Sequence, residues 1–245
     1  MHQQNKEFVS QLFTPVAIIV GSIIIAWAIA SGPSAGSINP TAAVALGNTN
    51  NNPAPTVAVD SAKVSTAGNP VVGNPNAKLT IAYWFDYQCP FCKKSEQTII
   101  SVLMKDYVDT GKVRIVFKDL QFLGTDSTKL GTIGRAVWEA TPDKYYAWHK
   151  AMFENQGQEN SGWATDAYVL SISTSVLGAS DAARVMDLAK QKSESYKKLL
   201  DADKAEGAAI GVRSTPNMVI GKTLVTGAQP YEQVKTAVDK ALNSK

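Results

Sequence analysis

The sequence predicts an α/β domain over residues 78–245, preceded by one N-terminal transmembrane helix and a disordered linker. Three observations carry this prediction. A β-branched and aromatic run, LTIAYWF, is followed at once by a C-x-x-C pair that opens a helical pattern. A long helical stretch follows a second strand-like run. The chain then closes with a hairpin pattern and an amphipathic helix, so strands and helices both contribute to one core.

The first hydrophobic segment, residues 12–30, has the sequence LFTPVAIIVGSIIIAWAIA and contains no charged residue. As a helix it would span about 28 Å at about 1.5 Å per residue, enough to cross a hydrocarbon core. Residues 1–11, which carry Lys6, are expected to stay in the cytoplasm, so the rest of the chain is expected outside it. The small residues at positions 28 and 30 also fit a signal-peptide cleavage site, and this alternative stays open.

The segment after it, residues 31–77, is dominated by Ser, Gly, Pro, Ala, Asn and Thr, and its only charges are Asp60 and Lys63. Such a composition buries too little apolar surface to offset the entropy of ordering the chain. We therefore expect a flexible linker with a root-mean-square reach of about 35 to 40 Å.

A strand, helix, strand unit is expected next. Residues 79–85 have strand composition, and Pro90 fits the first turn of a helix that starts at Cys89. Residues at helical spacing then define one apolar face: Cys92, Ile99, Leu103 and Tyr107. Residues 113–120, VRIVFKDL, form the second strand, and a parallel pairing of the two strands is expected.

Helical patterns dominate residues 125–208, and breaks divide them into several short helices at Pro142, Gly157 to Gly162 and Gly178 to Ser180. Within this part, the charged residues 181–206 are expected to form one helix with a solvated face. The pattern of residues 215–227 predicts two short strands joined around Gly221, and the apolar spacing of residues 231–242 predicts a closing helix.

Composition excludes several classes of function. The formal net charge is +3, only 18% of residues are charged, and we find no basic run with interleaved aromatics, so nucleic acid is not an expected partner. A structural zinc site usually needs four Cys or His ligands, whereas the chain has two cysteines, His2 and His149. No metal and no cofactor are expected. His149, within YYAWHKAMF, is interpreted as a packing histidine without a catalytic role.

The cysteine pair, Cys89 and Cys92, lies in DYQCPFCKK. A disulfide between them would close a very small loop and add little stability, so a structural role is disfavoured. The first cysteine faces the free N–H groups at the helix start, which stabilise a thiolate. The second lies one turn on, where it can attack a mixed disulfide. The spacing alone also fits half a metal site, but the preceding strand and following helix favour a redox pair.

The motifs FDYQCPFC and GVRSTPNMVIG, with a helical insertion between them, resemble the DsbA-like branch of the thioredoxin superfamily over residues 78–245. The resemblance implies a thioredoxin fold with an inserted helical domain, and a redox-active Cys89–Cys92 disulfide that takes part in thiol–disulfide exchange. It implies that Cys89 is the nucleophile, Cys92 the resolving cysteine, and Thr215-Pro216 the dipeptide with the cis-proline beside the active site.

The active-site dipeptide and the expected proton acceptor differ from the most oxidising relatives. The dipeptide is Pro90-Phe91, and Phe91 cannot donate a side-chain hydrogen bond to the thiolate; we expect it to be exposed on a peptide-binding surface. Relatives commonly carry a buried acid six residues before the first cysteine, where this chain has Tyr83. Asp86 is then the candidate proton relay, and an ordinary turn aspartate is the alternative.

The expected function is that of an extracytoplasmic protein-disulfide oxidase. It would be a single-pass cell-membrane protein, monomeric, with its catalytic domain in the periplasm or at the cell exterior, and it would donate its disulfide to exported unfolded or reduced proteins. The resemblance implies recycling by a quinone-linked membrane thiol oxidase, DsbB-like or VKOR-like. Two alternatives stay open: a disulfide reductase or isomerase, and a copper-binding chaperone that uses both thiolates, with Met218 as the nearest further ligand.

Overall fold

The computed structural model describes residues 59–244. The predicted membrane segment, residues 12–30, and the linker as far as residue 58 lie outside this range. Within residues 59–244, no helix combines the length and the apolar character that crossing a membrane requires.

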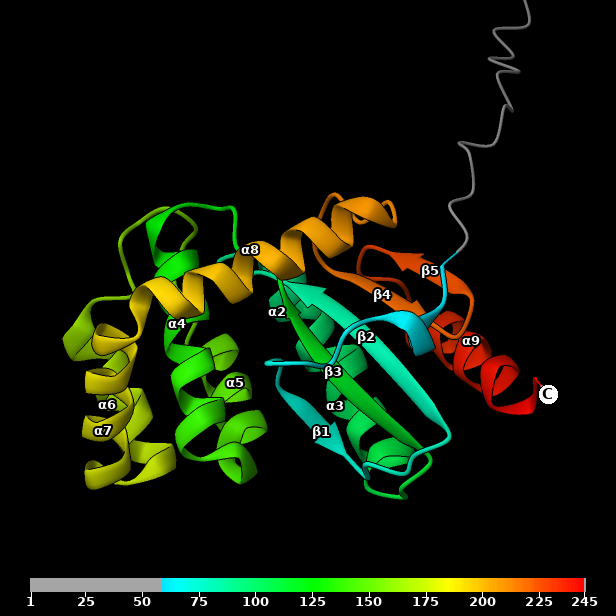
Figure 1. Cartoon of the computed structure of the whole chain (residues 1–245), viewed down its shortest axis with the longest axis horizontal. Helices are drawn as coiled ribbons and strands as arrows, with labels where there is room; N and C mark the ends of the chain where they lie inside the picture. Colours follow the sequence, from blue (N-terminus) through cyan, green and yellow to red (C-terminus); the bar gives the residue numbers. More distant parts are fainter. Residues whose placement is uncertain (1–58, 245) are drawn as a thin grey trace, which may run out of the picture. The chain divides into compact units, whose positions relative to one another are not determined.

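A mixed β-sheet forms the centre of the domain (Figure 1). Within the described range its five strands lie in the order β1-β3-β2-β4-β5. Strands β2 and β3 pair in parallel, as predicted, and the other neighbours are antiparallel. The strands are β1 (Val71–Gly73), β2 (Leu79–Phe85), β3 (Val113–Asp119), β4 (Asn217–Ile220) and β5 (Thr223–Thr226).

Strand β2 is buried on both faces, as its continuous hydrophobic sequence requires. Tyr83 and Phe85 point into the larger hydrophobic core, whereas Ala82 and Trp84 point into a smaller core on the opposite face. Successive side chains of a strand alternate between faces, so this strand contributes to both cores at once. Its carboxyl end leads directly into the cysteine motif at residues 86–92.

The helix after β2 runs without a break from Pro90 to Val108. The predicted apolar face is buried, at Cys92, Ile99, Leu103 and Tyr107. The sequence did not predict that α-helical and π-helical stretches alternate here: α2 (Pro90–Ser95), η2 (Glu96–Ile100), α3 (Ser101–Leu103) and η3 (Met104–Val108). Such π-helical turns occur frequently at functional sites.

The helical insertion lies between β3 and β4, and Figure 1 shows four of its helices, α4 to α7, gathered beside the sheet. The predicted breaks are found between its elements. These are α4 (Thr125–Ala140), η4 (Pro142–Lys144), α5 (Tyr145–Glu154), α6 (Asp166–Leu177), α7 (Ala179–Gln191) and α8 (Ser193–Ala209).

The prediction of one helix over residues 181–206 is wrong, because the chain turns at Lys192 between α7 and α8. The turn lets α8 run back to the sheet, where Asp203 forms buried ion pairs. Its carboxylate lies 2.5 Å from Nζ of Lys118 on β3 and also binds Arg135 of α4. Arg135 in turn donates to Asp119 at 2.7 Å. These ion pairs join the insertion to the sheet. Removing one partner of such a buried network strongly lowers the free energy of unfolding.

The prediction of a flexible linker is wrong for residues 59–77. This stretch contains the short helix η1 (Ser61–Lys63) and strand β1, which covers the edge of β3. Val59 and Val64 are buried against the smaller core, which includes Trp84. Isolated valines in a polar segment gave no periodic signal, yet each finds an apolar surface that the sheet would otherwise leave exposed.

The last part of the chain confirms the predicted hairpin and closing helix. Strands β4 and β5 are joined at Gly221, whose φ of 56° favours glycine in this turn. Helix α9 (Tyr231–Asn243) buries Val234 and Val238 in the larger core. Strand β4 lies beside β2, so the segment before it reaches the cysteine motif.

Candidate active site

The turn between β2 and α2 is held by the buried carboxylate of Asp86. It accepts hydrogen bonds from the backbone N–H groups of Gln88 at 2.8 Å, Phe122 at 2.8 Å and Leu123 at 3.0 Å. The hydroxyl of Ser127 donates a fourth bond at 2.6 Å. These donors fix the turn to the loop after β3. The arrangement favours a turn aspartate over the proton relay that the sequence left open.

Two glutamines that the sequence did not single out clamp the same turn. Gln156, in the loop after α5, donates to the backbone carbonyls of Tyr87 at 2.8 Å and Cys89 at 3.1 Å. Gln88 accepts from the backbone N–H of Asn160 at 2.8 Å. Each bond joins positions more than sixty residues apart, so no local pattern could have predicted it. The helical insertion thereby positions the cysteine motif.

Cys89 occupies the N-cap of α2, with extended backbone angles of φ −72° and ψ 117°. The hydrogen bond from the side chain of Cys92 holds the pKa of the Cys89 thiol at about 6, well below its usual value. The side chain of Thr215 and the backbone N–H groups of Cys92 and Phe91 lower this pKa further, while burial opposes them. The residue is only 5% exposed.

Cys92 lies one turn further along the helix and is fully buried. Burial raises the pKa of this thiol well above its usual value, and the bond to Cys89 with the charge on it raises the pKa further. Both cysteines are free thiols in this structure. The pair is therefore asymmetric: one sulfur is a thiolate near neutral pH and the other keeps its proton.

The segment across from the cysteines contains the predicted dipeptide. The peptide bond between Thr215 and Pro216 is cis, as predicted. The Sγ atom of Cys89 lies 3.6 Å from the carbonyl oxygen of Thr215. Phe91 is 63% exposed, which confirms the expectation for that side chain, and Pro90 beside it is also exposed. The structure thus brings the two predicted motifs together, although 126 positions separate the two bonded residues.

Polar side chains also lie buried behind Cys92. They are Tyr83, Ser95, Glu96 and His149. Sequence reasoning missed Glu96, although its place four residues after Cys92 puts both on one helix face and could have revealed it. His149 is fully buried among aromatic rings, with Phe85 4.7 Å and Phe117 4.8 Å away between centroids, which agrees with the packing interpretation.

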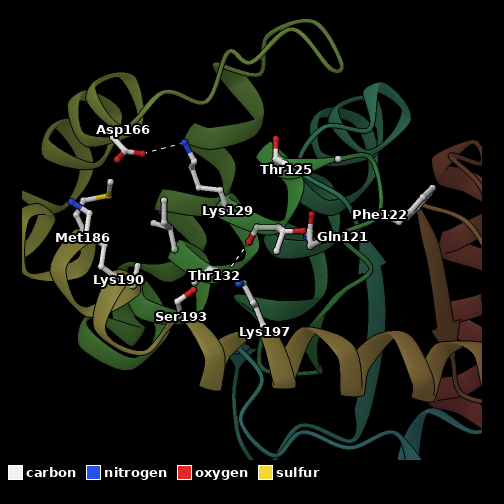
Figure 2. A pocket seen from close by; sticks show the side chains of 14 residues that line it. Gln121, Phe122, Thr125, Lys129, Thr132, Asp166, Met186, Lys190, Ser193 and Lys197 are labelled. Atoms are coloured by element: carbon white, nitrogen blue, oxygen red, sulfur yellow. Dashed lines mark hydrogen bonds and ion pairs between the residues drawn. The ribbon is translucent and has the colours of Figure 1, made fainter.

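A cavity of about 680 Å³ lies in the helical insertion, apart from the cysteines (Figure 2). Helices α4 and α7 and the start of α8 form its walls, and Lys129 pairs with Asp166 at 3.1 Å on its rim. None of the predicted site residues lines it. Within the described part of the chain, no group of three or more His, Cys, Asp or Glu side chains is placed to hold a metal ion.

Thiol–disulfide exchange needs one thiolate to attack and a second thiol to resolve the mixed disulfide, and the asymmetric pair at the start of α2 supplies both. Fold and site together define a DsbA-like protein-disulfide oxidoreductase. The family model described as thioredoxin matches residues 48–240, and the chain belongs to that family.

Relatives and solved structures agree with this assignment. Disulfide bond formation protein D of Bacillus subtilis is 25% identical over 178 residues, which cover 73% of this chain and 79% of that protein. The oxidised structure of BdbD from Bacillus subtilis shares the fold, with a TM-score of 0.68 at 23% identity over 77% of this chain and 99% of that one. The thiol-disulfide exchange protein α-DsbA2 of Wolbachia pipientis matches with a TM-score of 0.62 at 25% identity, over 71% of this chain and 87% of that one.

Proposed function

We propose that the chain is a membrane-anchored oxidase that donates the Cys89–Cys92 disulfide to exported proteins. The observation that carries this proposal is the low pKa of Cys89, about 6. Reduction of the disulfide produces a thiolate that the helix start and its neighbours stabilise. Stabilising the reduced form makes the disulfide the stronger oxidant.

The transfer proceeds in two exchange steps. A substrate thiolate attacks the Sγ atom of Cys89, the bond to Cys92 breaks, and Cys92 takes up a proton as it leaves. A second substrate thiolate then attacks the substrate sulfur of the mixed disulfide, and Cys89 leaves as a stabilised thiolate. The substrate gains a disulfide and loses two electrons, which the cysteine pair gains.

Exposed aromatic side chains, one in the cysteine motif and one on the loop after β3, suit an extended polypeptide. Phe91, directly after the motif's proline, is 63% exposed, and Phe122 is 46% exposed on the loop that Asp86 holds. Large exposed aromatic groups favour binding of apolar segments, which reduced and unfolded proteins present. The backbone before β4, at Thr215, offers groups for strand-like pairing with the substrate.

The proposed setting is extracytoplasmic. Residues 12–30 would anchor the protein in the cell membrane, with residues 1–11 in the cytoplasm and a spacer up to about residue 58 leading to the monomeric catalytic domain. Recycling would then need a partner that accepts two electrons from Cys89 and Cys92. A quinone-linked membrane thiol oxidase, DsbB-like or VKOR-like, has the required chemistry.

The direction of exchange decides between an oxidase and the reductase alternative. The oxidised full-length chain is mixed with an equal amount of a reduced, unfolded test protein that forms one disulfide. An oxidase converts the test protein to its disulfide form while Cys89 and Cys92 become thiols. A reductase leaves the test protein reduced and, when added as the dithiol, opens a preformed disulfide in it. An isomerase changes the pairing of a scrambled protein with no net oxidation.

A further inference from the structure

The buried polar groups behind Cys92 have no hydrogen-bond partners within residues 59–244. They are the hydroxyls of Tyr83 and Ser95, both carboxylate oxygens of Glu96 and Nε2 of His149. A buried polar atom without a partner costs stability, and native proteins rarely keep several together without a functional reason. Their position next to a buried thiol that must gain and lose a proton indicates such a reason.

Glu96 lies on the helix of the two cysteines. It follows Cys92 by four residues, one helical turn, so both side chains share a face, and its backbone N–H donates to the carbonyl of Cys92. The two residues are 1% and 0% exposed. Glu96 also begins the π-helical stretch η2. A carboxylate is thus held in the core within one turn of the resolving cysteine.

Tyr83 on β2 lies near Cys92 and Glu96. Burial raises the pKa of Tyr83 well above its usual value, and negative charges on Cys92 and Glu96 raise it further, while the side chain of Ser95 opposes them. The phenol therefore stays protonated and cannot itself be the acceptor. Because neither the phenol nor the Ser95 hydroxyl is engaged by another described residue, each can rotate and pass a proton.

His149 of α5 faces the carboxylate from the other side. Its Nε2 atom lies 3.4 Å from Oε2 of Glu96, and its Nδ1 atom lies 3.0 Å from the hydroxyl of Tyr87. Burial raises the pKa of Tyr87 well above its usual value, so its hydroxyl keeps its proton and is able to donate it to Nδ1. In the tautomer in which Tyr87 donates to Nδ1, the hydrogen is on Nε2 and faces the carboxylate.

Two further tyrosines of α5, Tyr145 and Tyr146, complete the titratable surroundings of Glu96. Burial raises the pKa of each well above its usual value, and the charge of Glu96 adds to this in both. They remain neutral throughout the pH range in which thiol exchange is measured. The other ionisable side chains buried here, among the described neighbours from α2 and α5, are Cys92, Glu96 and His149.

We propose that Glu96, positioned by His149, is the proton acceptor for Cys92, reached through the hydroxyls of Tyr83 and Ser95. This inference rests on the proposed exchange function. With a substrate bound to Cys89, the Cys92 thiol transfers its proton to Glu96, and the resulting thiolate attacks the Sγ atom of Cys89. The bond between Cys89 and the substrate breaks, and the substrate leaves as a thiolate. When the Cys89–Cys92 disulfide is opened by a substrate, the proton returns to Cys92.

The test uses the reduced full-length chain and Ellman's reagent. Attack by Cys89 releases one thionitrobenzoate and leaves a second on its sulfur; attack by Cys92 then releases the second, so the two steps appear as separate phases of absorbance. Burial raises the pKa of Cys92 well above its usual value. Without an internal acceptor the second rate would rise in proportion to hydroxide concentration. With Glu96 as acceptor the profile has a level region in which the second rate does not depend on hydroxide.

The variant Glu96→Gln keeps the shape of the side chain and removes the acceptor. At pH 7 the second phase should slow by about 10- to 100-fold and become proportional to hydroxide, while the first phase stays within about twofold of the unmodified chain. Glu154→Gln, the same change at the exposed end of α5, should alter neither phase. Glu96→Asp retains a carboxylate and should keep the level region of the pH profile at a reduced rate.

Two results would overturn the proposal: a second phase of the unmodified chain that follows hydroxide over the whole range, or a level region that persists in Glu96→Gln. If Glu96→Gln does not fold, the unmodified profile and Glu96→Asp decide the question. Loss of the level region in Glu96→Asp, with the fold intact, also counts against it. Failure of the exchange function is distinguishable, because the first phase would then be missing in every variant.

Discussion

Two cysteines of identical chemistry acquire opposite properties from their surroundings. Cys89 is stabilised as a thiolate by the side chains of Cys92 and Thr215 and by backbone N–H groups at the start of α2. Cys92, three residues on, is enclosed by apolar side chains and by the sulfur of its partner, which favour the neutral thiol. The order of attack in the exchange follows from this difference, because only a thiolate is an effective nucleophile.

Alkylation by iodoacetamide at different pH values measures this difference directly. The rate at Cys89 should rise with pH through about 6 and level off above it, because at pH 7 about nine-tenths of this thiol is ionised. Cys92 should stay unmodified, since it is buried and keeps its proton. Peptide mapping after alkylation distinguishes the two sites. Equal labelling, or a Cys89 titration near the ordinary thiol pKa, would contradict the assignment.

Replacing Asp86 by alanine separates a turn aspartate from a proton relay. The change leaves the buried N–H groups of Phe122 and Leu123 without their acceptor, so the free energy of unfolding should fall by about 3 kcal/mol. Denaturation by urea measures it. Ser127→Ala, which removes a single bond to the same carboxylate, should cost about 1 kcal/mol. If Asp86 were a proton relay, Asp86→Ala would leave the free energy of unfolding unchanged and would slow the second phase of the reaction with Ellman's reagent.

Sequence patterns could predict the two cysteines and the exposed Phe91, because each depends on a local motif, and the family resemblance implied the cis bond at Pro216. They could not predict Gln156, whose role arises from a contact across 67 positions. The contact between Cys89 and Thr215 likewise spans 126 positions.

At the scale of elements, prediction succeeded where apolar residues are periodic. The β2, α2 and β3 unit, the broken helices of the insertion and the closing α9 all carry such a pattern. Strand β1 carries none, since it is three residues long and sits in a polar segment. The turn at Lys192 was missed because residues on both sides favour a helix. The change of direction brings Asp203 to its buried partners Lys118 and Arg135.

A truncated chain tests whether residues 59–77 belong to the domain. A chain that starts at residue 78 lacks Val59, Val64 and β1, so the smaller core and the edge of β3 become exposed. Compared with a chain that starts at residue 55, its free energy of unfolding should be lower by about 3 kcal/mol or more. Guanidinium denaturation of both chains provides the comparison. Equal midpoints and slopes would show that this segment adds nothing to the fold.

At the scale of the whole molecule, the insertion and the sheet meet at the cysteine motif. Gln156 and Asn160 reach the turn from the insertion, while Thr215 reaches it from the strand on the other side. The site is therefore assembled only when both parts are folded.

Membrane attachment follows if residues 12–30 remain as an anchor. Full-length protein should then stay with the membrane fraction after washing with sodium carbonate and should still carry its first thirty residues. Immunoblotting and N-terminal sequencing of the membrane fraction provide the check. A soluble product that starts at Ser31 would identify the segment as a cleaved signal.

The central claim is that Cys89 attacks and Cys92 resolves, and trapping in cells tests it most directly. In a Cys92→Ala variant of the full-length chain, substrates bound to Cys89 can no longer be released by an internal thiol. Mixed disulfides with exported proteins should accumulate as slow bands on a non-reducing gel, collapse on reduction, and disappear when Cys89→Ala is added. A copper chaperone would form no such adducts and would lose copper binding in both variants. The absence of reducible adducts in Cys92→Ala, together with tight copper binding by the unmodified chain, would contradict the account.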